Sequence, residues 1–290
     1  MVERPVEADW LALRRSADHR ARERARDLLA LLREHLREVG ADEAAAWDVV
    51  DLGAGTGSNL AWLAPRLPGR QRWSLVDHDA DLAAVADTGE AAPGVEARWV
   101  LAGADCLTDL LADLEPEGPA TLVTCAALLD LLRPDDVGHL LDALAPVGRP
   151  GIPALLSLSV TGEVELHPSD PDDAFVAATF DAHQRRGGLL GPGAADVVAA
   201  ALRARGARVH LRSTDWVLGT GGATDADDAA LVRRYVRDRA DVVAEQDPSS
   251  ADRAQAWWRR REQQLERGEL RVRVGHVDLL SLPPRDRRVP

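Results

Sequence analysis

The chain has 290 residues, of which 48 are acidic and 35 basic, and its formal net charge is −13. With 46% apolar and 29% charged residues it has the composition of an ordinary globular protein, long enough for a sizeable core in one or two domains. The acidic balance argues against partners held mainly by phosphate neutralisation, because such proteins present a net basic face to the polyanion. A nucleic acid partner is therefore disfavoured.

The residue inventory removes further classes of function. The chain has no lysine, which excludes Schiff-base chemistry and the lysine of a phosphate-binding P-loop. Cys106 and Cys125 form neither a CxxC pair nor a disulfide framework, so a metal site and an extracellular location both lack support. The first nine residues hold no apolar signal segment, and no apolar run is long enough to span a bilayer. We expect a cytoplasmic protein without a membrane segment or a metal.

Residues 9–39 have a helical pattern, with leucines at spacings of three and four. The first turns of this segment place Trp10, Arg14, Asp18 and Arg22 at successive i, i+4 positions. The favoured interpretation of this row is a solvated face with Trp10 docked on the core. The alternative is an N-terminal helix that lies over an active site.

Short apolar runs then alternate with helical stretches. Strands are predicted at 48–52, 73–76, 95–101, 120–125, 154–160, 209–212 and 270–282. Helices are predicted around 60–67 and at 79–87, 106–113, 134–145, 171–186 and 194–205, with two more between 225 and 267. This alternation implies right-handed crossovers and a doubly wound α/β fold with a mainly parallel seven-stranded sheet. Ligands should then bind outside the carboxyl ends of the strands.

The most informative segment is an apolar strand that leads through three alternate glycines into a helix. It reads Val49-Val50-Asp51-Leu52-Gly53-Ala54-Gly55-Thr56-Gly57-Ser58-Asn59. Glycine is needed where the backbone turns tightly or approaches a ligand without a Cβ in the way, and the amides at the start of a helix can receive a negative group. A dinucleotide-binding fingerprint would require glycine where Ser58 stands, so the spacing DxGxGxG belongs to a different signature.

This segment resembles the first motif of class I S-adenosylmethionine-dependent methyltransferases. Asp77 closes the second predicted strand, where the resemblance implies an acid that binds the ribose hydroxyls. Asp105 follows the third predicted strand and matches the residue that usually receives the adenine amino group, while Cys125 and Ala126 match positions that line the cofactor. A carboxylate can accept two hydroxyl protons or an amino donor. Taken singly, Asp77 and Asp105 could instead be helix N-caps.

The resemblance implies S-adenosyl-L-methionine as the cofactor. The residues that we expect to bind it are Asp51, Gly53, Ala54, Gly55, Gly57, Asn59, Asp77, His78, Asp105, Cys106, Cys125 and Arg14. For Arg14 the expected partner is the methionine carboxylate or an acidic substrate. More loosely, the whole chain resembles an actinobacterial branch of these enzymes.

The expected organisation has four parts. They are an N-terminal helical cap (1–40), a Rossmann-like cofactor-binding core (41–213), a helical insertion or lid (214–268), and a last strand with its tail (269–290). Transfer of a methyl group from a sulfonium is an in-line displacement with the acceptor ~3 Å from the methyl carbon, so orientation and exclusion of water supply much of the rate. The helices outside the minimal sheet are the candidates for a lid.

An oxygen acceptor also needs a general base, whereas a carbanion or thiolate acceptor does not. His183, on the predicted 171–186 helix, is the first choice as base or substrate ligand; the alternative is an ordinary surface histidine. Asp130, after the fourth predicted strand, is the second choice; the alternative is a cap for the next helix.

Two attractive patterns are interpreted as structural. The run from His167 to Asp173, with two prolines and three aspartates, favours a turn and a helix start over a metal cluster. The run from Trp257 to Arg261 mixes aromatic and basic residues as RNA-binding proteins do, but the glutamates that follow favour an amphipathic helix. The tetrapeptide N/D-P-P-Y/F, associated with base methylation, is absent after the fourth predicted strand.

The sequence thus predicts a methyltransferase that acts on a small-molecule methyl acceptor. Two alternatives stay open. One is an RNA or protein methyltransferase, and the other is a cofactor-binding protein of the same fold that does not methylate, because a fold and a cofactor site do not fix the reaction. A homodimer is compatible with the sequence.

Overall fold

The computed structural model describes residues 7–41, 46–86, 93–103, 106–113, 121–145, 151–219 and 226–284. Its centre is one eight-stranded sheet in the order β3-β2-β1-β4-β5-β8-β6, with β7 paired to β8. The strands are β1 (Trp47–Leu52), β2 (Gln71–Asp77), β3 (Val95–Leu101), β4 (Thr121–Ala126), β5 (Ala154–His167), β6 (Arg208–Ser213), β7 (Trp216–Leu218) and β8 (Arg271–Leu282). Strands β1 to β5 pair in parallel, and β8 is antiparallel to β5, β6 and β7. The prediction of a mainly parallel α/β fold is confirmed.

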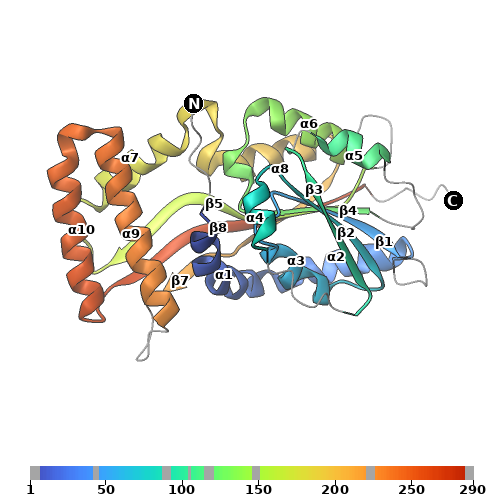
Figure 1. The fold of residues 1–290 in the computed structure, drawn as a ribbon. Coiled ribbons are helices and arrows are strands. Elements are labelled where there is room, and N and C mark those ends of the chain that lie inside the picture. The colour runs from blue at the N-terminus through green and yellow to red at the C-terminus, as the bar shows by residue number, and fades with distance from the viewer. Residues whose placement is uncertain are drawn as a thin grey trace.

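Helices cover both faces of this sheet (Figure 1). They are α1 (Ala8–Arg22), α2 (Arg26–Glu38), α3 (Ser58–Leu63), α4 (Ala80–Ala84), α5 (Leu107–Asp113), α6 (Pro134–Leu144), α7 (Asp173–Gln184), α8 (Ala194–Ala204), α9 (Ala226–Gln246) and α10 (Ala251–Glu266). Short 3₁₀ turns are η1 (Glu23–Ala25), η2 (Ala64–Arg66), η4 (Leu129–Leu131), η5 (Arg186–Gly188), η6 (Gly191–Gly193) and η7 (Pro248–Ser250). One core layer joins the sheet to α6 and α8, and another joins it to α2 and α3.

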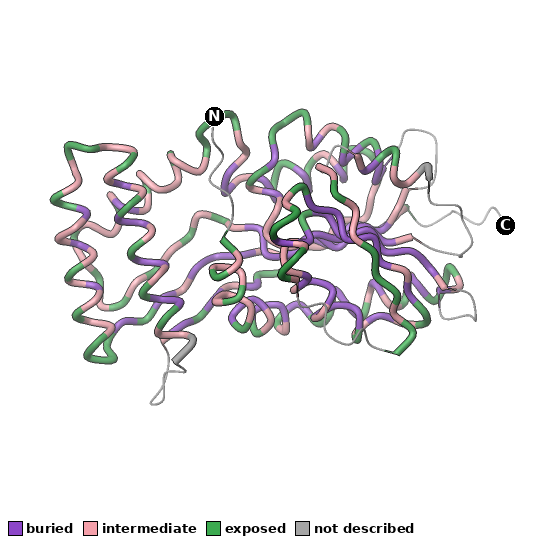
Figure 2. Tube along the Cα trace, viewed as in Figure 1, coloured by how far each residue is buried: buried purple, intermediate pink, exposed green. Residues whose placement is uncertain are grey.

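The central strand is buried along its whole length. All six residues of β1 are buried, as expected for a parallel strand with helices on both faces, and Figure 2 shows the buried trace concentrated at this part of the sheet. The parallel pairing brings the ends of β1, β2 and β4 to one edge, because Leu52 lies beside both Val76 and Cys125. The residues that follow these strands therefore meet at the same edge.

Strands β5 and β8 continue past the core and form an arm that carries α7, α9 and α10 (Figure 1). The predicted strand 154–160 ends seven residues too early, since β5 runs on to His167 opposite Arg271 of β8. In the first part of β5 six consecutive residues are buried, whereas from Val160 onward exposed residues alternate with partly buried ones. The arm is thus covered by helices on one face only. Strand β7 is absent from the sequence prediction, because three residues give too short a pattern to identify.

The row of residues from Trp10 to Arg22, along α1, faces the interior in its second half. Asp18 is 8% exposed and Arg22 only 1%, so the interpretation of this row as a solvated face is wrong. The i, i+4 spacing fixes only that these side chains share one side of the helix. They face inward because Arg22 has buried polar partners on α3 and β5, and Asp18 accepts a hydrogen bond from Trp216.

Candidate active site

The loop after β1 needs glycine for its shape and for its neighbours. Gly53, Gly55 and Gly57 have φ angles of 62°, 55° and 80°, in the left-handed region that other residues rarely adopt. A Cβ on Gly55 would lie 3.2 Å from Cδ1 of Leu11 on α1, and one on Gly53 would lie 3.0 Å from Cδ1 of Leu128. The loop is therefore closely covered by α1 and by the segment after β4.

Asp77, at the end of β2, holds this loop. Its Oδ2 accepts a hydrogen bond from the Gly55 amide at 2.7 Å, and its Oδ1 accepts one from the Asp79 amide at 3.0 Å. Asp79 is the N-cap of α4, accepting from the amides of Asp81 and Leu82, so Asp77 is not the cap of this helix. Each oxygen of Asp77 has made one hydrogen bond and can accept another. The side chain of the neighbouring His78 is 79% exposed, and its Nδ1 lies 3.6 Å from Oδ1 of Asp77.

Asp51 lies in the polar interior beneath the loop. Its Oδ1 accepts a hydrogen bond from Nδ2 of Asn59 at 2.6 Å, whereas its Oδ2 is buried with no hydrogen-bond partner within the described residues. Burial raises the pKa of Asp51 to about 7, against the opposing effects of Asn59 and Arg22. A buried carboxylate oxygen without a partner is costly, and a cationic donor at this position would remove the cost.

Arg22 organises the same interior from α1. Its guanidinium donates to Oδ1 of Asn59 at 2.8 Å and to the Ser157 hydroxyl at 3.2 Å, and it stacks on Trp62 at 3.9 Å from the ring centroid. Asp278 of β8 lies 3.9 Å from its Nε. The sequence prediction does not include Arg22 among the site residues. The sequence places Arg22 in the i, i+4 row that begins at Trp10, but this spacing alone does not show whether the row faces the interior or the solvent.

Arg14 lies two turns before Arg22 on α1, among aromatic side chains. Its Nε donates to Asp18 at 2.8 Å, and its guanidinium lies 5.0 Å from the ring of Trp216 and 5.9 Å from that of Trp10. The buried ring of His276 packs on Trp216 at 4.9 Å, and burial lowers the pKa of His276 to about 4. Arg14 thus has a protein carboxylate as partner, and its predicted role toward the cofactor remains a prediction.

The end of β4 supplies two further predicted residues. Cys125 is 1% exposed, and burial raises the pKa of its thiol, which keeps it protonated. Burial raises the pKa of Asp130, in η4, to about 6, although Arg14 favours its ionised form. Asp130 does not cap α6, because the capping carboxylate is that of Asp136, which accepts from the Arg133 amide at 2.8 Å. Asp130 is therefore a carboxyl group near the carboxyl end of β4 without a capping role at this helix.

The remaining predicted residues lie further away or cannot be placed. Asp105 lies outside the described residues, and Cys106 is half-buried immediately before α5. His183, near the end of α7, receives hydrogen bonds from Arg186, which also binds Glu245 of α9. The described contacts thus connect His183 to α9 and not to the glycine loop, and its catalytic role stays a prediction.

The two patterns interpreted as structural form one interface on the arm. The aspartates before and at the start of α7 pair with arginines of α10: Asp170 with Arg260 at 2.5 Å, Asp172 with Arg253 at 2.7 Å, and Asp173 with Arg261. Trp257 is fully buried in this interface. These acidic and basic residues neutralise each other and fix α10 against the start of α7.

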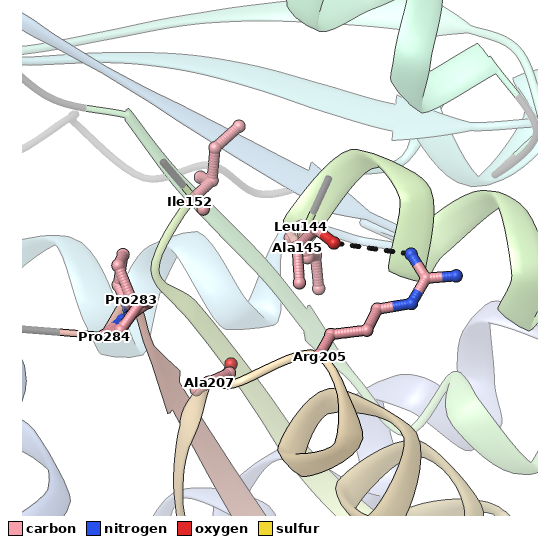
Figure 3. Close-up of a pocket in the computed structure, with 9 residues that line it drawn as sticks. Leu144, Ala145, Ile152, Arg205, Ala207, Pro283 and Pro284 are labelled. Carbon is pink, nitrogen blue, oxygen red and sulfur yellow. Dashed lines mark hydrogen bonds between the residues drawn. The ribbon is translucent and has the colours of Figure 1, made fainter. Parts of the chain in front are cut away.

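Two surface recesses lie away from the glycine loop. Figure 3 shows one of about 40 Å³ between the end of α6 and the segments before β5 and β6, where Arg205 donates to the Ala145 carbonyl at 3.4 Å. It lies at the amino ends of these strands and has room for little more than a water molecule. The other, of about 270 Å³, is lined by β5, β7 and β8 near the far end of the arm. Both recesses are thus distant in the fold from the carboxyl ends of β1, β2 and β4.

The residues around the loop fit S-adenosylmethionine. The glycines allow the tight turn, the unpartnered Oδ2 of Asp51 can receive an amino cation, and both oxygens of Asp77 can still accept from vicinal hydroxyls. These are the acceptors that the amino group and the sugar of an amino acid joined to a nucleoside require.

Comparisons with known proteins agree with this geometry. Residues 49–151, from β1 to the segment before β5, match the family described as a methyltransferase domain. No curated protein matches the sequence. Within the described residues, no helix is both long enough and apolar enough to cross a membrane.

Several solved structures are similar to the chain. The YcgJ protein of Bacillus subtilis is 14% identical over 90% of this chain and 99% of its own, with a TM-score of 0.46. S-adenosylmethionine-dependent methyltransferases of Geobacter sulfurreducens and Thiobacillus denitrificans, both in complex with S-adenosyl-L-homocysteine, are each 17% identical. They cover 98% and 96% of this chain and 100% and 99% of their own, with TM-scores of 0.43 and 0.42.

TM-scores below 0.5 carry little weight, so the assignment depends on the family match and on the glycine loop with its acids. Residues 49–151 thus match a methyltransferase domain, and the glycine loop with its acids fits S-adenosylmethionine.

Proposed function

We propose that this enzyme transfers the methyl group of S-adenosylmethionine to a small organic molecule. The observation that carries the proposal is the layer of side chains over the carboxyl ends of the strands. Leu11 and Leu128 pack on the glycine loop, and Trp10, Trp216 and Tyr235 continue this layer toward the arm. Such a cover suits an acceptor that can be enclosed, because methyl transfer benefits from exclusion of water.

The residues around the glycine loop each have a task in this proposal. The bound cofactor supplies a methyl group on a positively charged sulfur. Asp77 positions the sugar while it holds Gly55, and Asp51, oriented by Asn59, receives the amino end. The helix α1 closes the site by the contact of Leu11 with the loop and by the hydrogen bonds of Arg22 beneath it.

We propose Asp130 as the general base for an acceptor that must lose a proton. It follows the end of β4, and its pKa of about 6 suits a group that takes up a proton near neutral pH. His183 is the less favoured base, because its described partner is Arg186 on the outer side of the α7 and α9 pair.

A pH profile tests the role of Asp130. The ionised carboxylate is the active form, so turnover should rise as pH increases through about 6 and level off above it. Asp130→Asn should lower turnover by about 100-fold and abolish this inflection, while leaving the affinity for S-adenosylhomocysteine within about twofold. An inflection that persists in Asp130→Asn would assign it to another group, and His183→Ala is the matched comparison.

The proposed function itself is tested in two steps on the full chain. Calorimetry should first show binding of S-adenosylhomocysteine. Incubation with S-adenosylmethionine and pooled small phenols, amines and carboxylic acids should then release S-adenosylhomocysteine, detected by mass spectrometry together with the methylated product. Methylation of RNA or of protein, with none of the small molecules modified, would favour a polymer-modifying enzyme instead. Cofactor binding with no transfer to any acceptor would favour the non-methylating alternative.

A further inference from the structure

Arg239 on α9 is a buried arginine held between two aromatic rings. Its guanidinium carbon lies 3.9 Å from the ring centroid of Phe180 on α7 and 4.0 Å from that of Tyr235, one turn earlier on α9. The residue is only 7% exposed. Both rings thus lie in cation–π contact with the guanidinium and offer it no hydrogen-bond acceptor at their faces.

The charge of Arg239 lacks the partners that the other buried arginines have. Arg22 donates to Asn59 and Ser157, and Arg261 donates to the Pro168 carbonyl, Gln264 and Asp173. In the part of the chain that the structure describes, no carboxylate lies within 4.0 Å of Arg239. Its buried Nε has no hydrogen-bond partner, as is also true of Arg22 and Arg261, but unlike theirs its terminal nitrogens have no hydrogen bond among the described residues. A buried charge without a partner is costly, so this guanidinium is placed for something that the polypeptide does not supply.

The nearest acids do not compensate it. Asp238, the preceding residue, pairs with Arg234 at 2.7 Å. Asp181 of α7 acts on Arg239 only at longer range, and burial raises the pKa of that carboxyl. The neutral hydroxyl of Tyr235 is the other polar neighbour of the guanidinium.

A continuous series of aromatic and charged side chains connects Arg239 to the end of β4. Tyr235 meets Trp216 edge to face with ring centroids 6.3 Å apart, and Arg14 lies over the same Trp216 ring. Arg14 in turn acts on Asp130 after β4. The hydrophobic cluster of the arm contains Tyr235 and Trp216. Ala126, the last residue of β4, and Ala127, which follows it, pack against this cluster.

The backbone is also strained at this junction. Ala127 directly follows β4, and Leu158 lies within β5. Their φ angles are 57° and 56°, although neither residue is glycine. Such conformations are held at a cost by the surrounding structure and cluster at functional sites. Both strained residues pack in the cluster that also holds Trp216 and Tyr235.

We propose that Arg239 binds a carboxylate of the methyl acceptor, so that the substrate is a small organic acid with an aromatic or otherwise apolar body. This inference rests on the proposed function, whose substrate it specifies. The free edge of one guanidinium matches the two oxygens of a carboxylate, and the apolar body of the acid lies along the Trp216 and Tyr235 rings. A phosphate is disfavoured, because one arginine would balance only half the charge of a dianion, and Asp181 would repel a dianion about twice as strongly as a carboxylate.

The test uses the full chain saturated with S-adenosylhomocysteine and three pairs of probes. Each pair is an acid and its neutral amide: benzoate and benzamide, phenylacetate and phenylacetamide, trans-cinnamate and cinnamamide. Binding is measured by calorimetry and by the fluorescence of the tryptophans beside the site. At least one acid should bind at least about tenfold more tightly than its amide, as expected for a hydrogen-bonded charge pair. Arg239→Met should abolish this preference.

A matched variant on the same helix and a stability measurement complete the test. Arg237→Met removes an arginine that is 64% exposed and pairs with Asp241, and should keep the preference for acids. Arg239→Met should unfold at the same temperature as the parent chain or a higher one, because it removes an uncompensated buried charge. A purely structural arginine would instead lower the unfolding temperature when replaced, which would overturn the proposal.

The outcomes separate this inference from the function on which it rests. The carboxylate site is overturned if none of the three acids binds, or if Arg239→Met keeps the full preference for acids. In either case, binding of S-adenosylhomocysteine leaves the methyltransferase proposal intact. If S-adenosylhomocysteine itself does not bind, the proposed function fails first.

Discussion

Asp77→Ala should weaken the binding of S-adenosylhomocysteine by about 100-fold, the largest effect that we expect on cofactor affinity. The variant loses a carboxylate that is available to two sugar hydroxyls, and a hydrogen bond to a charged acceptor contributes about 1.5–3 kcal/mol. It also removes the acceptor of the Gly55 amide, which shapes the loop. Calorimetric titration of the full chain measures both affinities.

Asp81→Ala is the matched control for Asp77→Ala. Asp81 is an exposed acid four residues further along, and its removal changes the net charge equally without touching the loop. Asp77→Asn keeps the size of the side chain and one carbonyl acceptor, so its loss of affinity should be intermediate. An affinity for S-adenosylhomocysteine that is unchanged in Asp77→Ala would remove the sugar-binding assignment altogether.

The largest expected effect on stability is that of Arg22→Met, which should lower the free energy of unfolding by about 3–5 kcal/mol. The substitution leaves the buried Asp278 without its cation and Asn59 without its donor. Breaking one side of a buried charge pair costs far more than the pair itself contributes. Chemical denaturation monitored by tryptophan fluorescence provides the measurement.

The pH dependence of Arg22→Met supplies an internal check. Burial raises the pKa of Asp278, and loss of Arg22 raises it further, since Arg22 favours the ionised form. A folded-state pKa above the unfolded value means that the folded protein binds more protons, so its stability increases as pH falls. The difference between Arg22→Met and the parent chain should therefore shrink on acidification.

Two further variants isolate the buried pair in the Arg22 prediction. Arg22→Met combined with Asp278→Asn should recover part of the lost stability. Arg26→Met, which removes a 76% exposed arginine paired with Glu23, should change the free energy of unfolding by less than about 1 kcal/mol. Equal stability of Arg22→Met and the parent chain would show that the buried network does not hold α1 in place.

The glycine loop and its acids were accessible from the sequence because their signals are local. An apolar strand precedes the turn, and glycine occupies the left-handed positions. Asp77 stands at the end of the next strand, so two short segments of sequence specify both this part of the fold and the site. Parallel pairing then brings them together without further information. The mainly parallel sheet follows from the same alternation of strands and helices.

The buried arginines of α1 and α9 were less accessible from the sequence, because their surroundings depend on contacts between distant segments. Arg22 and Arg239 look in the sequence like any helical arginine, and only packing against Trp62, or between Phe180 and Tyr235, distinguishes them from solvated ones. His183 and Asp181 differ by two positions on α7 and so point to different sides of it. No periodicity shows which of those sides faces the site.

The unbroken course of β5 and β8 has a mechanical consequence. Because both strands pass from the core into the arm, the backbone pairing that supports α9 and α10 is anchored in the same ladder as the sheet, with irregular register only between Leu156 and Val164. Helix α1 has no such anchorage; its described contacts with the core beyond its own chain neighbours come from side chains such as His19, Arg22 and Trp10. We therefore expect α1, and not the arm, to move when substrate enters and product leaves the proposed site.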